Sequence, residues 1–285
     1  MDYPEYATDQ DLFYDFCLWQ YQPVAPPANK LRSVNLLYHT FHVAGMPNLI
    51  FDLVRTIRRG FGIFNTVWGT KLIGGDLRWE FYFYDYKRRQ RERSITKLLD
   101  VIRPFAECNL EIDEDFHYFM FSIDITDELI SKSKKLDEIH MYIGNPGSSV
   151  SSGICYSLKN SGMRLENFYF FFDAKKHRKE ILDKAYCSAY VDSRIKADQL
   201  FWPELQRCRI IVVANKQAND AIYFSGITVD QLIFFMKKMS YPGPLVRYTE
   251  ENKTRLDHML YDAGYDYRME GNDLVVLKSG YYGIF

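Results

Sequence analysis

The stretch Asp76-Leu-Arg-Trp-Glu-Phe-Tyr-Phe-Tyr-Asp-Tyr86 separates its residue types at a period of two. One face carries a cation, a carboxylate and three phenols, at Arg78, Glu80, Tyr82, Tyr84 and Tyr86. The other face is apolar, with Leu77, Trp79, Phe81 and Phe83. This alternation predicts a β-strand whose apolar face packs against another layer of the protein. Tyrosine needs apolar surroundings and a polar partner, so the second face suits a sheltered cavity; a half-solvated sheet face is the alternative.

Composition sets broad limits on the class of protein. The chain has 285 residues, a formal net charge of −1, 22 Tyr, 21 Phe and five scattered cysteines with no CxxC pair. The near-neutral balance offers no field for nucleic acid or an anionic membrane, and the cysteines form neither a metal knuckle nor a disulfide framework. The sequence shows neither a signal peptide nor an apolar run long enough to cross a bilayer. We therefore expect a cytoplasmic monomer with no nucleic-acid or membrane partner.

Turn and helix signals divide the chain into hairpins and helices. Gly74-Gly75 predicts a tight turn between two strands, and Ser94 predicts the N-cap of a helix. The expected strand pairs are 61–72 with 77–86, 116–124 with 137–145, 150–159 with 165–173, 209–215 with 221–226, and 265–270 with 273–285. Helices are expected at 9–20, 48–59, 95–103, 174–190, 229–239 and 249–263. A turn is expected at 145–149, and 30–41 fits a strand or a short helix.

Five hairpins interleaved with helices, without a linker of domain-boundary composition, allow two architectures. The ten antiparallel strands form either two adjacent α+β domains or one closed sheet with helices outside, and closure removes the edge strands. Several strands repeat the mixed polar and aromatic face of 76–86, which favours a lumen. We predict an α+β fold: a ten-stranded antiparallel β-barrel surrounded by helices, in repeated α-β-β-α units. It is expected to be a single domain over 1–285, with 1–45 as a helical or irregular extension packed on it.

No sequence motif identifies a chemistry. The chain has no GxGxxG, Walker A, GxSxG or HExxH motif, and its acidic clusters at 111–115 and 124–128 lack a metal-ligand spacing. Cys155 is interpreted as buried packing, with a nucleophile as the alternative.

Residue types on the expected inner faces are more informative. If the sheet closes, five cations from separate hairpins could converge on one anion: Lys71, Arg78, Lys159, Lys216 and Lys278. Buried cations are expensive without partners, so convergence implies an anionic ligand or acidic neighbours such as Glu80 and Glu138. Five phenol rings would surround the same space, at Tyr82, Tyr142, Tyr169, Tyr223 and Tyr282. Cations beside aromatic faces suit a diphosphate that leaves a carbocation.

By architecture and residue type, residues 46–285 resemble the aromatic prenyltransferases of the PT-barrel (ABBA) fold. The resemblance implies transfer of a prenyl group from a prenyl diphosphate to an aromatic small molecule or a peptide side chain. The cations named above would hold the diphosphate and the tyrosines would shield the allyl cation. Glu80 or His140 would orient the nucleophile or take its proton. No tightly bound cofactor is implied; Mg²⁺ is compatible with the reaction, but no motif requires it.

Two other readings remain open at the level of sequence. An acyltransferase built from two GNAT-like halves would split the chain near residue 130 or 190, although the chain lacks a clear pyrophosphate-binding loop. The other is non-enzymatic: a barrel that binds an apolar or aromatic ligand, or an interaction protein whose inward tyrosines belong to the core.

Overall fold

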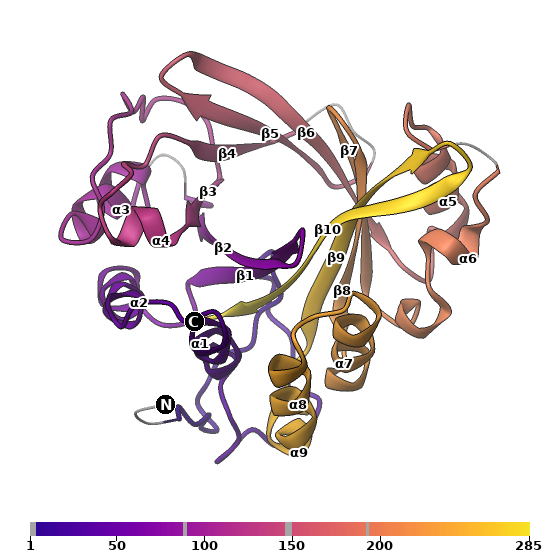
Figure 1. The fold of residues 1–285 in the computed structure, drawn as a ribbon, viewed down its shortest axis with the longest axis horizontal. Coiled ribbons are helices and arrows are strands. Elements are labelled where there is room, and N and C mark those ends of the chain that lie inside the picture. The colour runs from indigo at the N-terminus through magenta and orange to yellow at the C-terminus, as the bar shows by residue number, and fades with distance from the viewer. Residues whose placement is uncertain (1–3, 88–89, 146–149, 192–193) are drawn as a thin grey trace.

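The computed structural model describes residues 4–87, 90–145, 150–191 and 194–285, and its ten described strands close into one antiparallel barrel (Figure 1). Strands follow each other round the barrel in chain order, and β1 (Thr66–Ile73) pairs with both β2 (Asp76–Tyr84) and β10 (Asp273–Ile284). The others are β3 (Met120–Ile125), β4 (Ile139–Gly144), β5 (Ser152–Lys159), β6 (Gly162–Asp173), β7 (Ile210–Lys216), β8 (Asp220–Ile227) and β9 (Tyr261–Glu270). The predicted ten-stranded barrel is confirmed.

Helices surround the barrel on its outer side (Figure 1). They are α1 (Val34–Val43), α2 (Leu49–Phe61), α3 (Ile95–Ile102), α4 (Asp127–Ile130), α5 (Arg178–Tyr186), α6 (Ala197–Leu200), the 3₁₀ turn η1 (Pro203–Leu205), α7 (Val229–Lys238), α8 (Gly243–Glu251) and α9 (Lys253–Leu256). The order does not follow a regular α-β-β-α repeat, because α4 stands between β3 and β4 and no described helix separates β4 from β5.

The two faces of β2 have the roles that their alternation predicts. Trp79 donates its indole N–H to Thr40 of α1 at 2.7 Å, and the Phe83 ring lies 5.0 Å from the Phe61 ring of α2. Glu80 and Tyr82 point the other way and line the lumen. The apolar face therefore fixes the helices to the barrel, while the opposite face defines its interior.

Local signals account for several boundaries. The Ser94 hydroxyl accepts the Lys97 N–H at 3.1 Å, which confirms the predicted N-cap of α3. Gly74 and Gly75 have φ of 59° and 94°, values that glycine adopts without steric cost, and they form the β1–β2 turn. The predicted turn at 145–149 falls largely on residues 146–149, outside the described part of the chain.

Two predicted helices are wrong. Residues 9–20 form turns and isolated bridges, because the Asp15 carboxylate accepts the N–H groups of Cys17 and Trp19 at 3.0 Å each. A short acidic side chain that binds nearby backbone competes with helix formation in this way. Residues 249–263 contain the end of α8, the short α9 and the start of β9 in place of one helix. The undecided segment 30–41 contributes most of α1.

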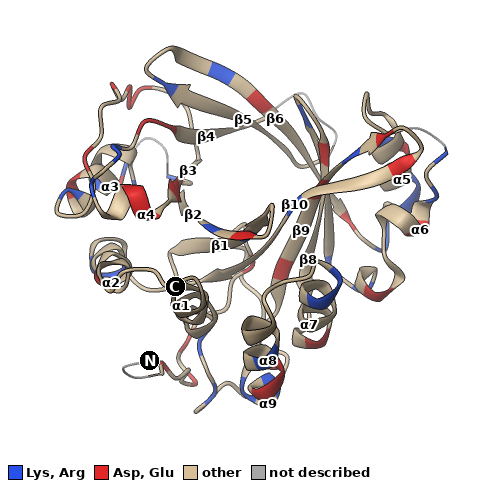
Figure 2. Cartoon of the chain, viewed as in Figure 1, with Lys and Arg blue, Asp and Glu red and all other residues tan. Residues whose placement is uncertain are grey.

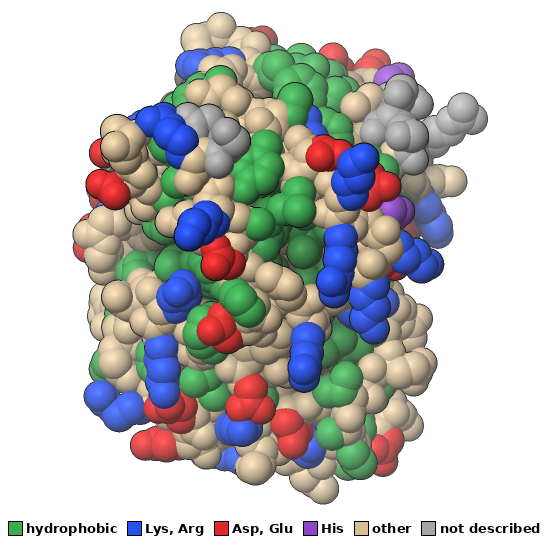
Figure 3. Space-filling model, turned by 90° about the vertical axis from the view of Figure 1, so that its right-hand side faces the viewer, with side chains coloured by type: hydrophobic (Ala, Val, Ile, Leu, Met, Phe, Trp, Pro, Cys, Tyr) green, Lys and Arg blue, Asp and Glu red, His purple; other side chains and the backbone are tan. Residues whose placement is uncertain are grey.

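Charges of both signs are spread over the molecule. Figure 2 shows Lys, Arg, Asp and Glu on helices and strands alike. Figure 3 looks onto the side that carries α5 and α6 in Figure 1, and there apolar side chains lie among residues of both charges. In the described part of the chain, none of the helices combines the length and apolar character required to cross a bilayer.

Glycines on neighbouring strands make room for two of the large rings inside the barrel. Tyr282 lies opposite Gly69, and Tyr223 lies opposite Gly264. A Cβ on Gly264 would come within 2.3 Å of the Tyr223 ring and 2.6 Å of the Ile222 carbonyl oxygen. That carbonyl belongs to the β8 ladder and cannot move freely, so only glycine fits at 264.

Gly264→Ala should therefore destabilise the barrel by about 1–3 kcal/mol through overpacking. Gly144→Ala is the matched control, since a Cβ at that strand position meets no atom within 4 Å. Thermal unfolding of both variants beside the parent measures the difference. Equal melting temperatures for the two variants would contradict the packing described for Tyr223.

Candidate functional site

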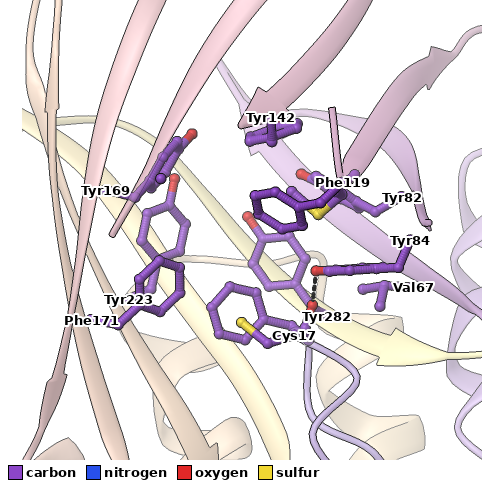
Figure 4. Close-up of a pocket in the computed structure, with 13 residues that line it drawn as sticks. Cys17, Val67, Tyr82, Tyr84, Phe119, Tyr142, Tyr169, Phe171, Tyr223 and Tyr282 are labelled. Carbon is purple, nitrogen blue, oxygen red and sulfur yellow. Dashed lines mark hydrogen bonds between the residues drawn. The ribbon is translucent and has the colours of Figure 1, made fainter. Parts of the chain in front are cut away.

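Two cavities occupy the lumen and share one set of rings. An apolar cavity of about 70 Å³ is lined by Val67, Phe119, Met120 and Phe171, with Phe16 and Cys17 of the N-terminal segment (Figure 4). A polar cavity of about 80 Å³ contains Lys71, Glu80, His140, Asn167, Lys216, Asp266 and Lys278. Both cavities are lined by the five tyrosines that the sequence analysis placed in the lumen: Tyr82, Tyr142, Tyr169, Tyr223 and Tyr282. The lumen is therefore polar in one half and apolar in the other.

The shared rings form a belt across the lumen, one from each even-numbered strand. Their neighbouring centroids are 6.0 Å apart for Tyr142–Tyr169, 6.4 Å for Tyr169–Tyr223, 6.2 Å for Tyr223–Tyr282 and 5.9 Å for Tyr82–Tyr282. These separations are typical of interacting aromatic pairs. Burial raises the pKa of all five phenols well above the ordinary value, so the hydroxyls of the belt are neutral.

One ion pair dominates the side of the polar cavity formed by β1 and β2. The Lys71 ammonium contacts Glu80 and lies 3.3 Å from Asp124. Glu80 also accepts hydrogen bonds from the Ser122 hydroxyl and, at 2.7 Å, from the Tyr82 hydroxyl. Burial alone would raise the pKa of Glu80, but the Lys71 ammonium holds it well below its usual range. Burial would lower the pKa of Lys71, but Glu80 and Asp124 raise it well above the ordinary value. Both groups are therefore charged.

On the opposite side, two lysines share one carboxylate. Asp266 Oδ2 lies 2.8 Å from Lys216 Nζ and 3.4 Å from Lys278 Nζ, and it also accepts the Asn219 side-chain amide at 3.0 Å. Lys216 also donates a hydrogen bond to the Tyr223 hydroxyl, at 3.2 Å. Burial would raise the pKa of Asp266, but Lys216 and Lys278 lower it. Among the described residues that line the polar cavity, three lysines thus face two carboxylates.

The remaining predicted polar residues lie at or beyond the edge of this cavity. His140 lines it, with Nδ1 3.9 Å from Glu80 and Nε2 3.5 Å from Glu138. Lys159 pairs with Glu138 at 3.1 Å, and Arg78 with Asp76 at 3.6 Å. The side chains of Lys159 and Arg78 are about half exposed, at 52% and 48%, and line neither cavity. The expected convergence of five cations is wrong for these two.

An N-terminal segment, residues 13–21, covers the apolar end of the lumen. The Tyr84 hydroxyl donates to the Phe16 carbonyl (Figure 4), and the Tyr86 hydroxyl donates to the Cys17 carbonyl at 2.6 Å. Asp262 of β9 accepts the Phe16 N–H at 2.9 Å and the Gly226 N–H at 3.2 Å. The segment is thus fixed by its own backbone to Tyr84 of β2, to Tyr86 just beyond that strand and to Asp262 of β9.

The Asp262 carboxyl retains its proton in the folded state far more readily than in water. Burial raises its pKa to about 7, and the neighbouring Asp15 carboxyl adds to this rise. Both aspartates are only 4% exposed. Cys155 on β5 is also unsuited to ionise, since burial raises the pKa of its thiol to about 12. A nucleophilic Cys155 is therefore not supported, and the packing interpretation fits.

Sequence reasoning missed Asp262, Asp266 and the lumen residues Phe16 and Cys17. The signal for the aspartates is present: Asp262, Gly264 and Asp266 alternate with Tyr261, Ala263, Tyr265 and Tyr267. The expected helix at 249–263 concealed Asp262, whereas Asp266 lay within the expected strand 265–270 and was not singled out. Phe16 and Cys17 reach the lumen from a turn, which has no face periodicity to detect.

Comparison with known proteins gives one informative similarity. The chain is 22% identical, over 91% of its length, to a protein of Acanthamoeba polyphaga mimivirus named as a JmjC domain-containing protein. The alignment covers 47% of that protein, so this chain spans about half the length of the relative. No protein-family model matches the chain.

This similarity overturns the predicted resemblance to the aromatic prenyltransferases of the PT-barrel fold, because it points to a JmjC protein instead. The predicted prenyl transfer and the prenyl diphosphate co-substrate, with or without Mg²⁺, are wrong with it. The GNAT-like alternative is not supported either, because the described strands form one closed sheet and not two halves. The roles of individual residues in anion binding or proton transfer are not tested by the comparison and stay predictions.

Breaking the Lys71–Glu80 pair should be more harmful than removing both charges. Lys71→Met leaves Glu80 buried beside neutral hydroxyls, and we expect a loss of about 3–5 kcal/mol in the free energy of unfolding. The double variant Lys71→Met/Glu80→Gln should lose less, because the amide oxygen still accepts hydrogen bonds. Urea unfolding measures both. A double variant that loses as much stability as Lys71→Met, or more, would contradict the pairing.

The raised pKa of Asp262 predicts a specific pH dependence. Between pH 3.8, the ordinary pKa, and about pH 7, unfolded Asp262 ionises while folded Asp262 keeps its proton. The folded state binds more protons there, so stability falls as pH rises, by up to about 1.4 kcal/mol per pH unit. Asp262→Asn should flatten this fall between pH 5 and 7, and Asp52→Asn, an exposed aspartate on α2, should not. An unchanged slope for Asp262→Asn would contradict the assignment.

Proposed function

We propose that the barrel binds one small organic anion with an aromatic or other apolar body. The observation that carries the proposal is the division of the lumen, in which an apolar half meets a polar half with one cation in excess. The apolar body would lie against Phe119 and Phe171 within the tyrosine belt. The anionic group would lie near Lys278, the lysine with the longest contact to a carboxylate.

Size and charge both support this class of ligand. Each cavity is several times the roughly 10–15 Å³ that one water molecule needs, which is room for a ring or a carboxylate. Lys71 and Lys216 already have close carboxylate partners, so an incoming anion gains most from Lys278. Its side chain is 35% exposed and therefore open to a ligand.

The name of the mimivirus relative suggests a second candidate, an oxygenase that uses Fe(II) and 2-oxoglutarate as JmjC-domain proteins typically do. The described residues do not fit that metal: no group of three or more His, Cys, Asp or Glu side chains among them could hold an ion. His140 is the histidine of the polar cavity, and its neighbour Glu80 is already bound by Lys71, Ser122 and Tyr82. We therefore derive no iron-dependent step for this chain.

Topology supports the same distinction. Jelly-roll folds of the cupin type combine two sheets through Greek-key connections, whereas the described strands here pair with their neighbours in chain order.

Calorimetric titration with trans-cinnamate and its neutral amide, trans-cinnamamide, tests the proposal. Cinnamate should bind more tightly than cinnamamide. Lys278→Met should weaken cinnamate binding about 10- to 100-fold, the effect of losing a charged hydrogen bond, and should leave cinnamamide unchanged. Lys159→Met is the matched control, because Lys159 lies outside the cavities and its replacement should not change the binding of cinnamate.

Equal affinity for acid and amide, or equal loss in Lys278→Met and Lys159→Met, would overturn the proposal. A parallel titration with 2-oxoglutarate, with and without Fe(II), addresses the oxygenase alternative. Iron-dependent binding of 2-oxoglutarate without binding of cinnamate would replace our proposal by that alternative. Binding of cinnamate with no effect of iron would support our proposal of an organic-anion site.

A further inference from the structure

Lys278 lies on the inward face of β10, beside an irregularity of the strand. On β10 it pairs directly with Asp266 of β9, and the ladder between the two strands shifts register between Val276 and Lys278. Such bulges redirect side chains and are frequent beside active sites. From this position Lys278 lines the polar cavity with Tyr282, four residues further along the same face.

The ammonium form of Lys278 is stabilised by fewer or longer carboxylate contacts than the ammonium forms of Lys71 and Lys216. Lys71 contacts two carboxylates, whereas Lys278 approaches one oxygen of Asp266 at 3.4 Å. That oxygen already accepts Lys216 at 2.8 Å and Asn219 at 3.0 Å. The Lys216 ammonium, and then burial, lower the pKa of Lys278, and the opposing effect of Asp266 does not cancel them. Lys71 and Glu80 also act on it, with opposite signs.

We propose that Lys278 is a carbonyl-reactive amine, which condenses with an aromatic or conjugated aldehyde held between the tyrosine belt and the polar cavity. Three geometric features support this: its Nζ faces a cavity, its side chain is accessible, and an aromatic surface adjoins it. A desolvated lysine next to another cation is a recognised way to obtain a nucleophilic amine. The inference rests on the proposed lumen site and adds a covalent step to it.

The condensation balances without any oxidant or reductant. The lone pair of uncharged Lys278 Nζ attacks the aldehyde carbon, a C–N bond forms, and the oxygen becomes the hydroxyl of a carbinolamine. That hydroxyl leaves as water, carrying the two protons that the amine nitrogen gives up, and a C=N bond remains. The proton that the ammonium must first release passes to water, because the Lys278 side chain is 35% exposed. The product is an imine that water can hydrolyse back to amine and aldehyde.

Trapping with trans-cinnamaldehyde and sodium cyanoborohydride tests the proposal, since reduction converts the imine to a stable secondary amine. Peptide mapping by mass spectrometry should find Lys278 modified faster than exposed Lys159 at pH 7. The advantage is about tenfold for each unit by which its pKa is lowered. Lys278→Arg, which keeps the charge, should remove this fast site without loss of fold.

Lys216→Met provides a readout that a purely structural role would not change. Without the Lys216 ammonium, Asp266 is left to Lys278, so the pH of half-maximal trapping should rise and a higher pH should restore the rate. Modification of Lys278 no faster than of Lys159, or an unchanged pH profile in Lys216→Met, would overturn the inference. Cinnamate binding without trapping would defeat only this step, whereas trapping without cinnamate binding would defeat only the proposed anion site.

Discussion

The pairing of β1 with β10 is the constraint on which the rest of the molecule depends. It joins the first strand of the sheet to the last over the pairs from Val67–Ile284 to Ile73–Lys278. Without it the sheet would be open, with two unpaired edges and an inner face exposed to water. With it, one face of every strand lies towards an enclosed space. The enclosed space is what makes tyrosines, rather than smaller polar residues, suitable for that face.

Closure also determines the electrostatics of the lumen. Charges in an enclosed space interact more strongly than charges in water, so each lysine depends on the carboxylate beside it. Lys71 forms an ion pair with Glu80, while Lys216 and Lys278 both form ion pairs with Asp266. An excess of one cation would be of little consequence on a surface. Inside the barrel it leaves Lys278 with the longest carboxylate contact of the three lysines.

Period-two alternation predicted which residues face the lumen, and it could do so because a strand's faces follow from its sequence alone. All five tyrosines of the belt were found by this rule. Alternation does not give position along the barrel axis, however. Arg78 and Lys159 are placed by the sequence on inward faces, yet they stand near strand ends, where long side chains reach water and pair with Asp76 and Glu138. The face of the strand on which a residue lies could be predicted, but its position along the barrel axis could not.

The covered end of the lumen and the choice of chemistry required three-dimensional information for different reasons. Phe16 and Cys17 reach the lumen from a turn held by Asp262, a contact between residues 246 positions apart. A metal site requires several ligands with free lone pairs to converge. Whether they do depends on the side chains of this chain and not on the name of a relative. Glu80 uses its oxygens on Lys71, Ser122 and Tyr82. Carboxylates committed to lysines and phenols favour binding an organic ion over binding iron, because the cation in excess remains available while the metal ligands do not.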